Sequence, residues 1–127
     1  MMGPYKNLQV WKLSMDFVTI LYKVTSKFPK EEVYGLTSQM RRAAVSIPSN
    51  IAEGYGRITN NDLVVFLHHA LGSSNELDAQ IQIAYNLQYI TEQDYVELNR
   101  QNEVICKMLQ SLIYKRTSAS ENKTTKP

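Results

Sequence analysis

The sequence contains little cysteine and no long hydrophobic run, and each absence limits what the protein can be. A single cysteine, Cys106, excludes an intramolecular disulfide framework and any metal site built from several thiolates. No run of about 18 apolar residues exists, so we expect no transmembrane helix. The N-terminal stretch MMGPYKNLQVWK also lacks the apolar centre of a secretory signal peptide. We therefore expect a cytoplasmic protein that does not engage a membrane.

Strong net charge is also absent. The 127 residues are 43% hydrophobic and 20% charged, which is typical of one globular domain. The net charge is only +2, but its distribution is uneven: residues 1–60 contain 8 Lys and Arg against 4 Asp and Glu, whereas residues 61–90 contain 0 against 3. Any basic surface must therefore come mainly from the first half of the chain.

Alternation of the strand type is absent, whereas apolar residues recur at helical spacing in four segments. These segments are 8–27, 37–56, 60–88 and 92–116. Helices of this size are about 30 to 43 Å long at 1.5 Å per residue, and their short connections are typical of an antiparallel up-down-up-down four-helix bundle. We predict an all-α fold in which residues 1–116 form the bundle. Residues 117–127 are almost devoid of apolar side chains, which predicts a disordered tail.

Threonines mark the predicted starts of three helices. The predicted N-caps of the second, third and fourth helices are Thr37, Thr59 and Thr91. Asp62 and Asp94, three residues after the last two of these, give both sites the form of a capping box with Asp in place of Glu.

Two helices carry more apolar surface than one narrow buried face requires. In the first helix the stripe Trp11, Met15, Val18 and Tyr22 adjoins a second one, Val10, Leu13, Phe17, Leu21 and Val24, which predicts a wide buried face. In the third helix a far-side stripe opposes the inward one and consists of Val65, Gly72, Glu76, Ala79 and Ile83. A helix with two such stripes usually contacts two neighbours, and here the second neighbour is expected to be another subunit. Gly72 and Ala79 would permit its close approach.

The second helix contains a polar ridge. Its members fall within an arc of about 100° and are Gln39, Arg42, Ser46, Ser49, Asn50, Glu53 and Arg57. A plain solvated face is one explanation of this ridge. Solvated faces usually carry Lys and Glu at i, i+4 spacing, however, whereas Ser, Asn and Gln suit hydrogen-bonded contact with a partner.

If this ridge is buried at a subunit interface, we expect Arg42 to form an ion pair with Glu53 or, from the third helix, with Glu76, because an unpaired buried charge is very unfavourable. We interpret one set of residues as an interface or buried polar seam: Gln39, Arg42, Ser46, Asn50, Glu53 and Glu76. Pro48 removes a backbone donor within the same helix, at a cost on the order of 3 kcal/mol. We predict a kink at Pro48 that is fixed by packing on both sides.

Recognisable catalytic and metal-binding arrangements are absent. His68 and His69 are adjacent, so they cannot bind one metal ion as an i, i+4 pair would. Cys106 lies in an apolar helix without an activating base near it in sequence, which favours a core thiol over a nucleophile. Trp11 and the tyrosines could stack on nucleic-acid bases, but their spacing favours core positions for most of them. We expect no enzymatic activity, cofactor, metal or small-molecule substrate.

Residues 28–57, FPKEEVYGLTSQMRRAAVSIPSNIAEGYGR, closely resemble the signature of the four-helix bundle family known as 23S ribosomal RNA intervening-sequence proteins. The longest matching elements are Tyr34-Gly35-Leu36, Arg41-Arg42-Ala43, Ser46-Ile47-Pro48 and Asn50-Ile51-Ala52-Glu53-Gly54. Residues 66–84 resemble the third helix of the family, and the likeness covers roughly residues 5–115.

This resemblance implies a small antiparallel bundle that assembles into a ring-shaped homopentamer. Members of the family are encoded in intervening sequences inserted in bacterial ribosomal RNA genes and elsewhere in genomes. A related bundle protein is an accessory factor of diversity-generating retroelements, and it uses a basic pentamer to engage nucleic acid and a reverse transcriptase. The partners implied here are copies of the chain itself and RNA or a nucleoprotein.

The candidate phosphate contacts are long cations on helices, namely Arg41, Arg57, Lys12, Lys23 and Lys27. An alternative function is a protein assembly scaffold without a nucleic-acid role. Salt dependence distinguishes the two, because electrostatic RNA binding weakens steeply as salt rises.

Overall fold

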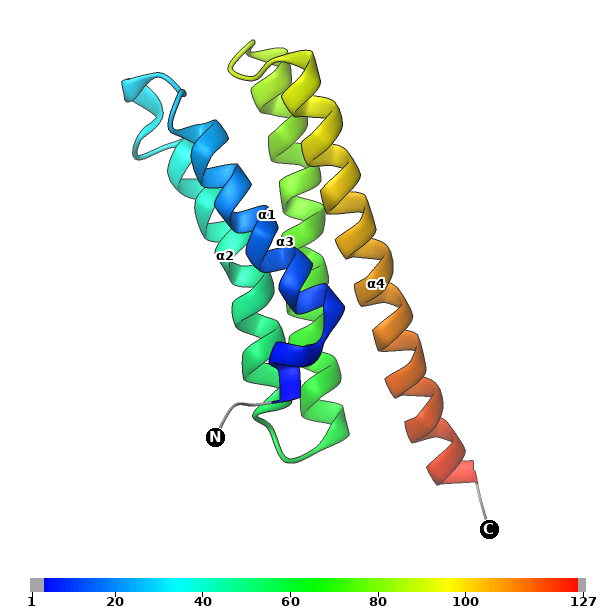
Figure 1. Cartoon of the computed structure of the whole chain (residues 1–127). Helices are drawn as coiled ribbons and strands as arrows, with labels where there is room; N and C mark the ends of the chain where they lie inside the picture. The colour runs from blue at the N-terminus through cyan, green and yellow to red at the C-terminus, as the bar shows by residue number, and fades with distance from the viewer. Residues whose placement is uncertain (1–3, 126–127) are drawn as a thin grey trace.

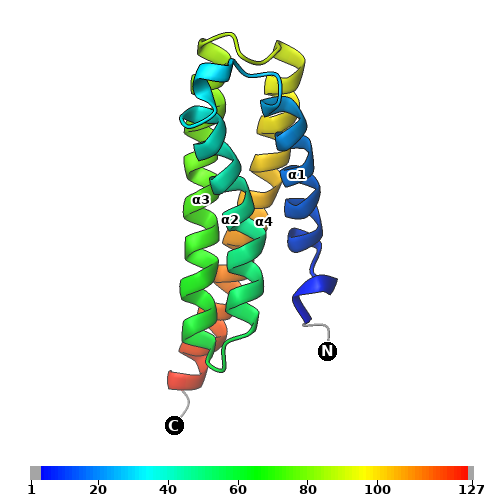
Figure 2. The same ribbon diagram turned by 90° about the vertical axis from the view of Figure 1, so that its left-hand side faces the viewer.

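The computed structural model describes the backbone of residues 4–125 and the side chains of residues 5–118. Its long elements are α1 (Gln9–Thr25), α2 (Leu36–Tyr55), α3 (Asn60–Asn86) and α4 (Glu92–Thr125). Two short 3-10 helices, η1 (Pro4–Asn7) and η2 (Lys30–Glu32), precede α1 and α2. The described backbone contains no strand, so the predicted all-α fold is confirmed. Figures 1 and 2 show the chain reversing direction at each connection, so that each long helix runs opposite to the one before it.

The four long helices do not pack equally closely. The contact between α2 and α3 is the most extensive, and that between α1 and α4 is the weakest of the pairs of neighbouring long helices. Gly54 lies at the close α2–α3 contact, since a Cβ atom there would lie 2.9 Å from Leu63 Cδ1 and Phe66 Cβ. Figure 1 shows α4 diverging from α1 and extending beyond the ends of the other helices.

The core is built from apolar side chains at helical spacing on each long helix. On α2 the side chains of Met40, Ala44, Ile47 and Ile51 are fully buried, and α3 and α4 contribute Leu67, Leu77, Ile81, Leu98, Ile105 and Leu109. Burial of each large aliphatic side chain contributes roughly 1.5–3 kcal/mol. In α1 the stripe that contains Phe17 and Leu21 is largely buried, but Met15 and Tyr22 on the adjoining stripe remain 42% and 41% exposed. The predicted wide buried face of α1 is thus only half covered within one chain.

One hydrogen-bonded polar pair lies inside the bundle. Ser74 Oγ donates to Asn102 Oδ1 over 2.8 Å, and Asn102 Nδ2 donates to the Ser74 carbonyl over 3.0 Å. Both residues are buried, and the pair joins α3 to α4 in a specific register because neither side chain has water as an alternative partner.

The structure confirms two of the predicted N-caps and corrects the third. Thr59 Oγ1 accepts from the backbone N–H of Asp62, and Thr91 Oγ1 accepts from that of Asp94. Thr37 instead lies inside α2 and is buried. The carboxylate of Glu32 accepts the N–H of Leu36 over 3.1 Å, so a residue four positions before the helix takes the role that we assigned to Thr37.

The predicted disordered segment is also corrected. α4 continues to Thr125 rather than ending near residue 116, and residues 126–127 of the predicted tail lie outside the described backbone. Residues 117–126 contain neither glycine nor proline, so no residue there breaks the helix that the core residues of α4 begin.

Candidate interface across α1, α2 and α3

A polar groove between α2 and α3 brings together most of the predicted seam. The groove has a volume of about 380 Å³ and is lined by Gln39, Arg42, Ala43, Ser46, Ser73 and Glu76. The side chains of Gln39, Arg42, Glu53 and Glu76 are exposed, whereas Ser46 and Asn50 are half-buried. A seam buried within one chain is therefore wrong, because these residues lie on the outer rims of the two helices. A contact surface for another molecule remains a valid interpretation.

Hydrogen bonds at the floor of this groove join α2 to α3. Asn50 Nδ2 donates to both the carbonyl and the Oγ of Ser46, each over 2.8 Å. Ser73 Oγ donates to Ser46 Oγ, also over 2.8 Å. Ser73 is not among the predicted seam residues, although it follows Gly72 in the segment 66–84 that resembles the third helix of the family. Ser46 therefore lines the groove and also joins α2 to α3, whereas Asn50 holds the Ser46 side chain from within α2.

Within one chain neither seam carboxylate pairs with Arg42, so the predicted ion pair at a subunit interface stays a prediction. Glu53 pairs over 2.6 Å with Arg57, which lies one turn further along the chain, just beyond the end of α2, whereas Arg42 is three turns away. Glu76 accepts a hydrogen bond from Gln80 Nε2 over 3.3 Å. Among the described side chains Arg42 takes part in no ion pair. Arg42 and Glu76 thus line one groove with opposite charges, but they do not neutralise each other within the chain.

Arg41, a predicted phosphate contact, is held by α1 instead. Its Nε donates to Thr25 Oγ1 over 2.9 Å, and its Nη2 donates to the Tyr22 carbonyl over 3.2 Å. The guanidinium also lies 4.4 Å from the centre of the Tyr22 ring. All three contacts are made at the C-terminal end of α1, where the free carbonyls of the helix favour a cation. Arg41 therefore fastens α2 to α1.

The other predicted phosphate contacts divide into two groups. The guanidinium of Arg57 already has partners within the chain, since it pairs with Glu53 and lies 4.8 Å from the centre of the Phe66 ring. Lys12, Lys23 and Lys27 are exposed and form no ion pair among the described residues. Lys12 and Lys23 project from α1 only about 20° apart, so they share one side of that helix.

An apolar groove lies between α1 and α2, on the other side of α2 from the polar groove. It has a volume of about 330 Å³ and is lined by Tyr5, Trp11, Met15, Val18, Val45, Pro48, Ser49 and Ala52. Val45 is 39% exposed, so α2 contributes a second large apolar side chain to solvent beside Met15 of α1. Pro48 is buried in the wall of this groove, and α2 is continuous through it from Leu36 to Tyr55. The predicted kink at Pro48 stays a prediction.

The far-side stripe of α3 faces outward from the bundle, as its position opposite the core requires. Val65 is 50% and Ile83 is 46% exposed, and Gly72, Glu76 and Ala79 between them are exposed as well. A Cβ atom added to Gly72 would meet nothing within 4 Å. Packing within the chain therefore does not require glycine at this position in the middle of α3.

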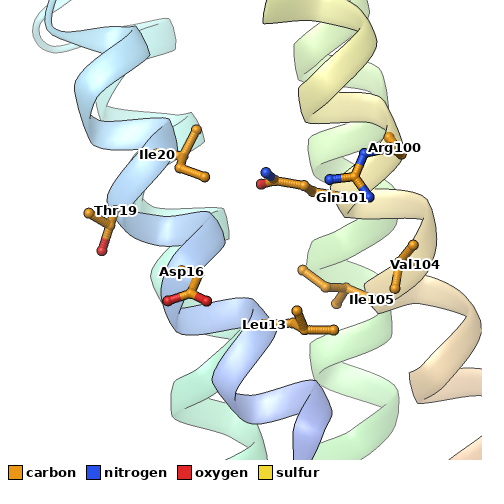
Figure 3. A pocket seen from close by; sticks show the side chains of 8 residues that line it. All are labelled: Leu13, Asp16, Thr19, Ile20, Arg100, Gln101, Val104 and Ile105. Atoms are coloured by element: carbon orange, nitrogen blue, oxygen red, sulfur yellow. The ribbon is translucent and has the colours of Figure 1, made fainter.

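A separate cleft of about 370 Å³ opens where α1 and α4 are weakly packed. Figure 3 shows its apolar walls, Leu13 and Ile20 from α1 facing Val104 and Ile105 from α4. Gln101 also points into the gap, and its buried Oε1 has no hydrogen-bond partner. At the rim Arg100 Nη2 donates a hydrogen bond to Glu97 Oε1 over 2.6 Å. This bond, and to a smaller extent the hydrogen bond from Gln101, lowers the pKa of Glu97 to about 2. None of the predicted site residues lines this cleft.

Metal-binding clusters and membrane-spanning helices are absent from the part of the chain that the structure describes. There, no group of three or more His, Cys, Asp and Glu side chains is placed to hold a metal ion. His68 and His69 are both exposed, and Cys106 Sγ lies 4.0 Å from Asn75 Oδ1. Within the same residues no helix is both long and apolar enough to cross a membrane.

The geometry defines a small all-α protein of four long helices whose prominent surface features are grooves between helices. The model of one family, described as 23S rRNA-intervening sequence protein, matches residues 6–111. The chain belongs to this family.

A solved structure supports the same assignment. It is a crystal structure of a protein of unknown function from the S23 ribosomal protein family of Bacteroides thetaiotaomicron. The two chains superimpose with a TM-score of 0.74 at 26% sequence identity, and the alignment covers 82% of this chain and 97% of the other. A comparison with curated proteins found no match.

Proposed function

We propose that this protein is a non-enzymatic helical bundle that assembles with copies of itself, and that the assembly binds RNA or a nucleoprotein weakly through lysines of α1. The observation that carries the proposal is the composition of one surface, which consists of the outer side of α2 and the flanking parts of α1 and α3. Figure 2 looks onto this surface, with α2 in front between α3 and α1.

This surface has the composition of a protein interface. Residues 38–52 of α2 contain two charged residues, Arg41 and Arg42, and Arg41 is fastened to α1. Trp11, Met15 and Val45 lie beside them in the apolar groove. Interfaces are depleted of charge at their centres and enriched in aromatic residues, Met and Arg. Membership of the family agrees with assembly, since the resemblance implies a ring of five subunits.

RNA binding by the proposed assembly depends on the same few exposed lysines being repeated in every copy. Of the five predicted phosphate contacts, Arg41 and Arg57 already have partners within the chain. One copy therefore presents three of these cations without such a partner, the exposed Lys12, Lys23 and Lys27. Asp16 lies on the same side of α1 and reduces the local positive charge. Several copies in one assembly multiply the lysines and so raise the number of phosphates contacted, which supports binding at low salt.

Two measurements test the proposal in order. Light scattering of the purified protein is expected to give a mass that is a multiple of the 14.6 kDa chain, and a monomer at all concentrations would refute assembly. Retention of structured RNA is then expected to fall steeply as salt rises, and more steeply for the unchanged protein than for Lys12→Gln with Lys23→Gln, because each phosphate contact adds to the salt dependence. Absence of retention at low salt would refute the RNA part alone.

A protein assembly scaffold without a nucleic-acid role is the second candidate. The observation that favours it is the engagement of Arg41 and Arg57 by other residues of the chain, which makes both arginines less available to phosphate.

A further inference from the structure

This inference specifies the contact between copies and rests on the proposed assembly. We propose that the outward stripe of α3 in one copy packs into the α1–α2 groove of a neighbouring copy, and that Arg42 of the receiving copy pairs with Glu76 of the inserted α3. The occupant of the groove is therefore a second copy of this chain.

The receiving surface is an apolar groove, and on α2 an arginine without an ion-pair partner lies close to it. Trp11, Met15 and Val45 contribute to the groove, and Arg42 lies one turn before Val45 along α2. Arg42 has no ion-pair partner among the described side chains, although Glu76 lines the same polar groove. A neighbouring carboxylate would complete this surface, and long apolar side chains around the pair would shield it from screening by salt.

The inserted surface is a helix face that allows close approach. Gly72 stands in the middle of the 27-residue helix α3, where glycine lowers helix stability relative to alanine. Space within the chain does not explain it, because a Cβ atom at Gly72 would have no neighbour within 4 Å. A second helix can approach Gly72 and Ala79 closely because neither residue has a large side chain. Glu76, which lies between them, supplies the carboxylate that Arg42 lacks.

The heights of these groups along the bundle also agree. Ser73 on α3 and Ser46 on α2 are hydrogen-bonded, so their neighbours Gly72 and Val45 lie at about the same height. Arg42 and Glu76 line one groove and are likewise level. Rotation about an axis parallel to the bundle preserves height, and it therefore places Glu76 of one copy level with Arg42 of the next and Gly72 level with the apolar groove.

The two surfaces that meet are different parts of the molecule. Contacts of this kind join head to tail, and a ring forms when the rotation between copies closes. The charge of the contact is balanced, since each interface contains one Arg42 and one Glu76. This complementarity favours a second copy over an acidic or basic partner, which would leave one of the two charges unpaired.

Charge reversal tests the pairing directly. Arg42→Glu and Glu76→Arg are each expected to raise the dissociation constant of the assembly by about tenfold or more, and the double variant is expected to recover most of that loss. Asp78→Arg is the matched control, since it reverses a charge on the same helix but on the side that faces the α3–α4 groove. Light scattering over a dilution series gives the dissociation constants, and circular dichroism with urea unfolding verifies that each variant is folded.

A steric pair of variants provides an independent test. Gly72→Leu is expected to prevent assembly, whereas Asn75→Leu, on the α4-facing side of α3, is expected to leave it unchanged. If the unchanged protein assembles and the folded single charge variants or Gly72→Leu assemble equally well, this contact is wrong and the proposed assembly stands. Failure of the double variant to recover would also overturn the Arg42–Glu76 pairing. If the unchanged protein is monomeric at every concentration, both proposals fail together.

Discussion

Replacement of Arg41 separates a structural role from a role in RNA binding. Arg41 makes two hydrogen bonds to α1 and lies over the Tyr22 ring, and Thr25, which accepts one of these bonds, is only 2% exposed. A hydrogen bond to a charged group contributes about 1.5–3 kcal/mol, and a cation over an exposed ring contributes about 0.5–1 kcal/mol. Because Arg41 and Tyr22 are partly open to water, we expect Arg41→Ala to lower the free energy of unfolding by about 2 kcal/mol in total.

Arg41→Lys makes the test specific. Lysine retains the charge but does not reproduce the arrangement in which Nε reaches Thr25 Oγ1 while Nη2 reaches the Tyr22 carbonyl. We therefore expect the lysine variant to lose most of the same stability and to bind RNA with an unchanged salt dependence. Arg57→Ala is the control, since its exposed ion pair is expected to contribute less than about 1 kcal/mol.

Urea unfolding at one fixed protein concentration measures these effects, because assembly makes apparent stability depend on concentration. With a urea slope of about 1–3 kcal/mol per molar, a loss of 2 kcal/mol shifts the midpoint by roughly 1 M. The reasoning is refuted if Arg41→Ala unfolds at the same urea concentration as the unchanged protein. It is also refuted if Arg41→Lys is fully stable while Arg41→Ala is not, since charge alone would then suffice.

Three further predictions follow from other parts of the bundle. Gly54→Ala is expected to destabilise the fold by about 1–3 kcal/mol, since its Cβ would lie 2.9 Å from Phe66 Cβ; an unfolding free energy equal to that of the unchanged protein contradicts the close α2–α3 contact. Gln101→Met is expected to stabilise the protein, because removing the buried unpartnered Oε1 outweighs the loss of the hydrogen bond from Nε2 to Glu97 near the surface; a lower melting temperature contradicts this expectation. The carboxyl of Glu97, whose pKa is lowered to about 2, is expected to contribute stability above its unfolded pKa near 4.5 and to lose that contribution as the pH falls toward 2. An NMR titration midpoint near 4.5 contradicts this ion-pair geometry.

The helices were predictable from sequence because their signal is local and repeated. The stripe Met40, Ala44, Ile47 and Ile51 has the period of a helix, and the same period fixes the side of α2 that meets the core. The start of α2 was not predictable, since its N-terminus is capped by Glu32 from a short 3-10 turn rather than by the adjacent Thr37. The length of α4 differs from the prediction, because a polar composition after residue 116 does not by itself end a helix.

The side of a helix on which a residue lies was easier to predict than the contacts that its side chain makes. The polar ridge predicted that Arg42 and Ser46 share a side of α2, which requires helical geometry alone. The role of Arg41 could not be inferred in this way, because its partner Thr25 is on another helix and the side-chain direction depends on how α1 and α2 cross. The bond between Ser46 and Ser73 likewise depends on the register of α2 against α3, which no local pattern specifies.

The weak packing of α1 against α4 has a consequence for how the molecule opens. Local unfolding begins where few apolar contacts would be broken, and amide hydrogen exchange reports it residue by residue. Of the neighbouring long-helix pairs, α1–α4 makes the weakest contact, and the cleft in Figure 3 already separates part of it. The α2–α3 hairpin is expected to keep its protected amides longest, while those of α1 exchange first. In such an opening α1 would move as a hinged element, and Arg41 adds to the apolar contacts that hold it on α2.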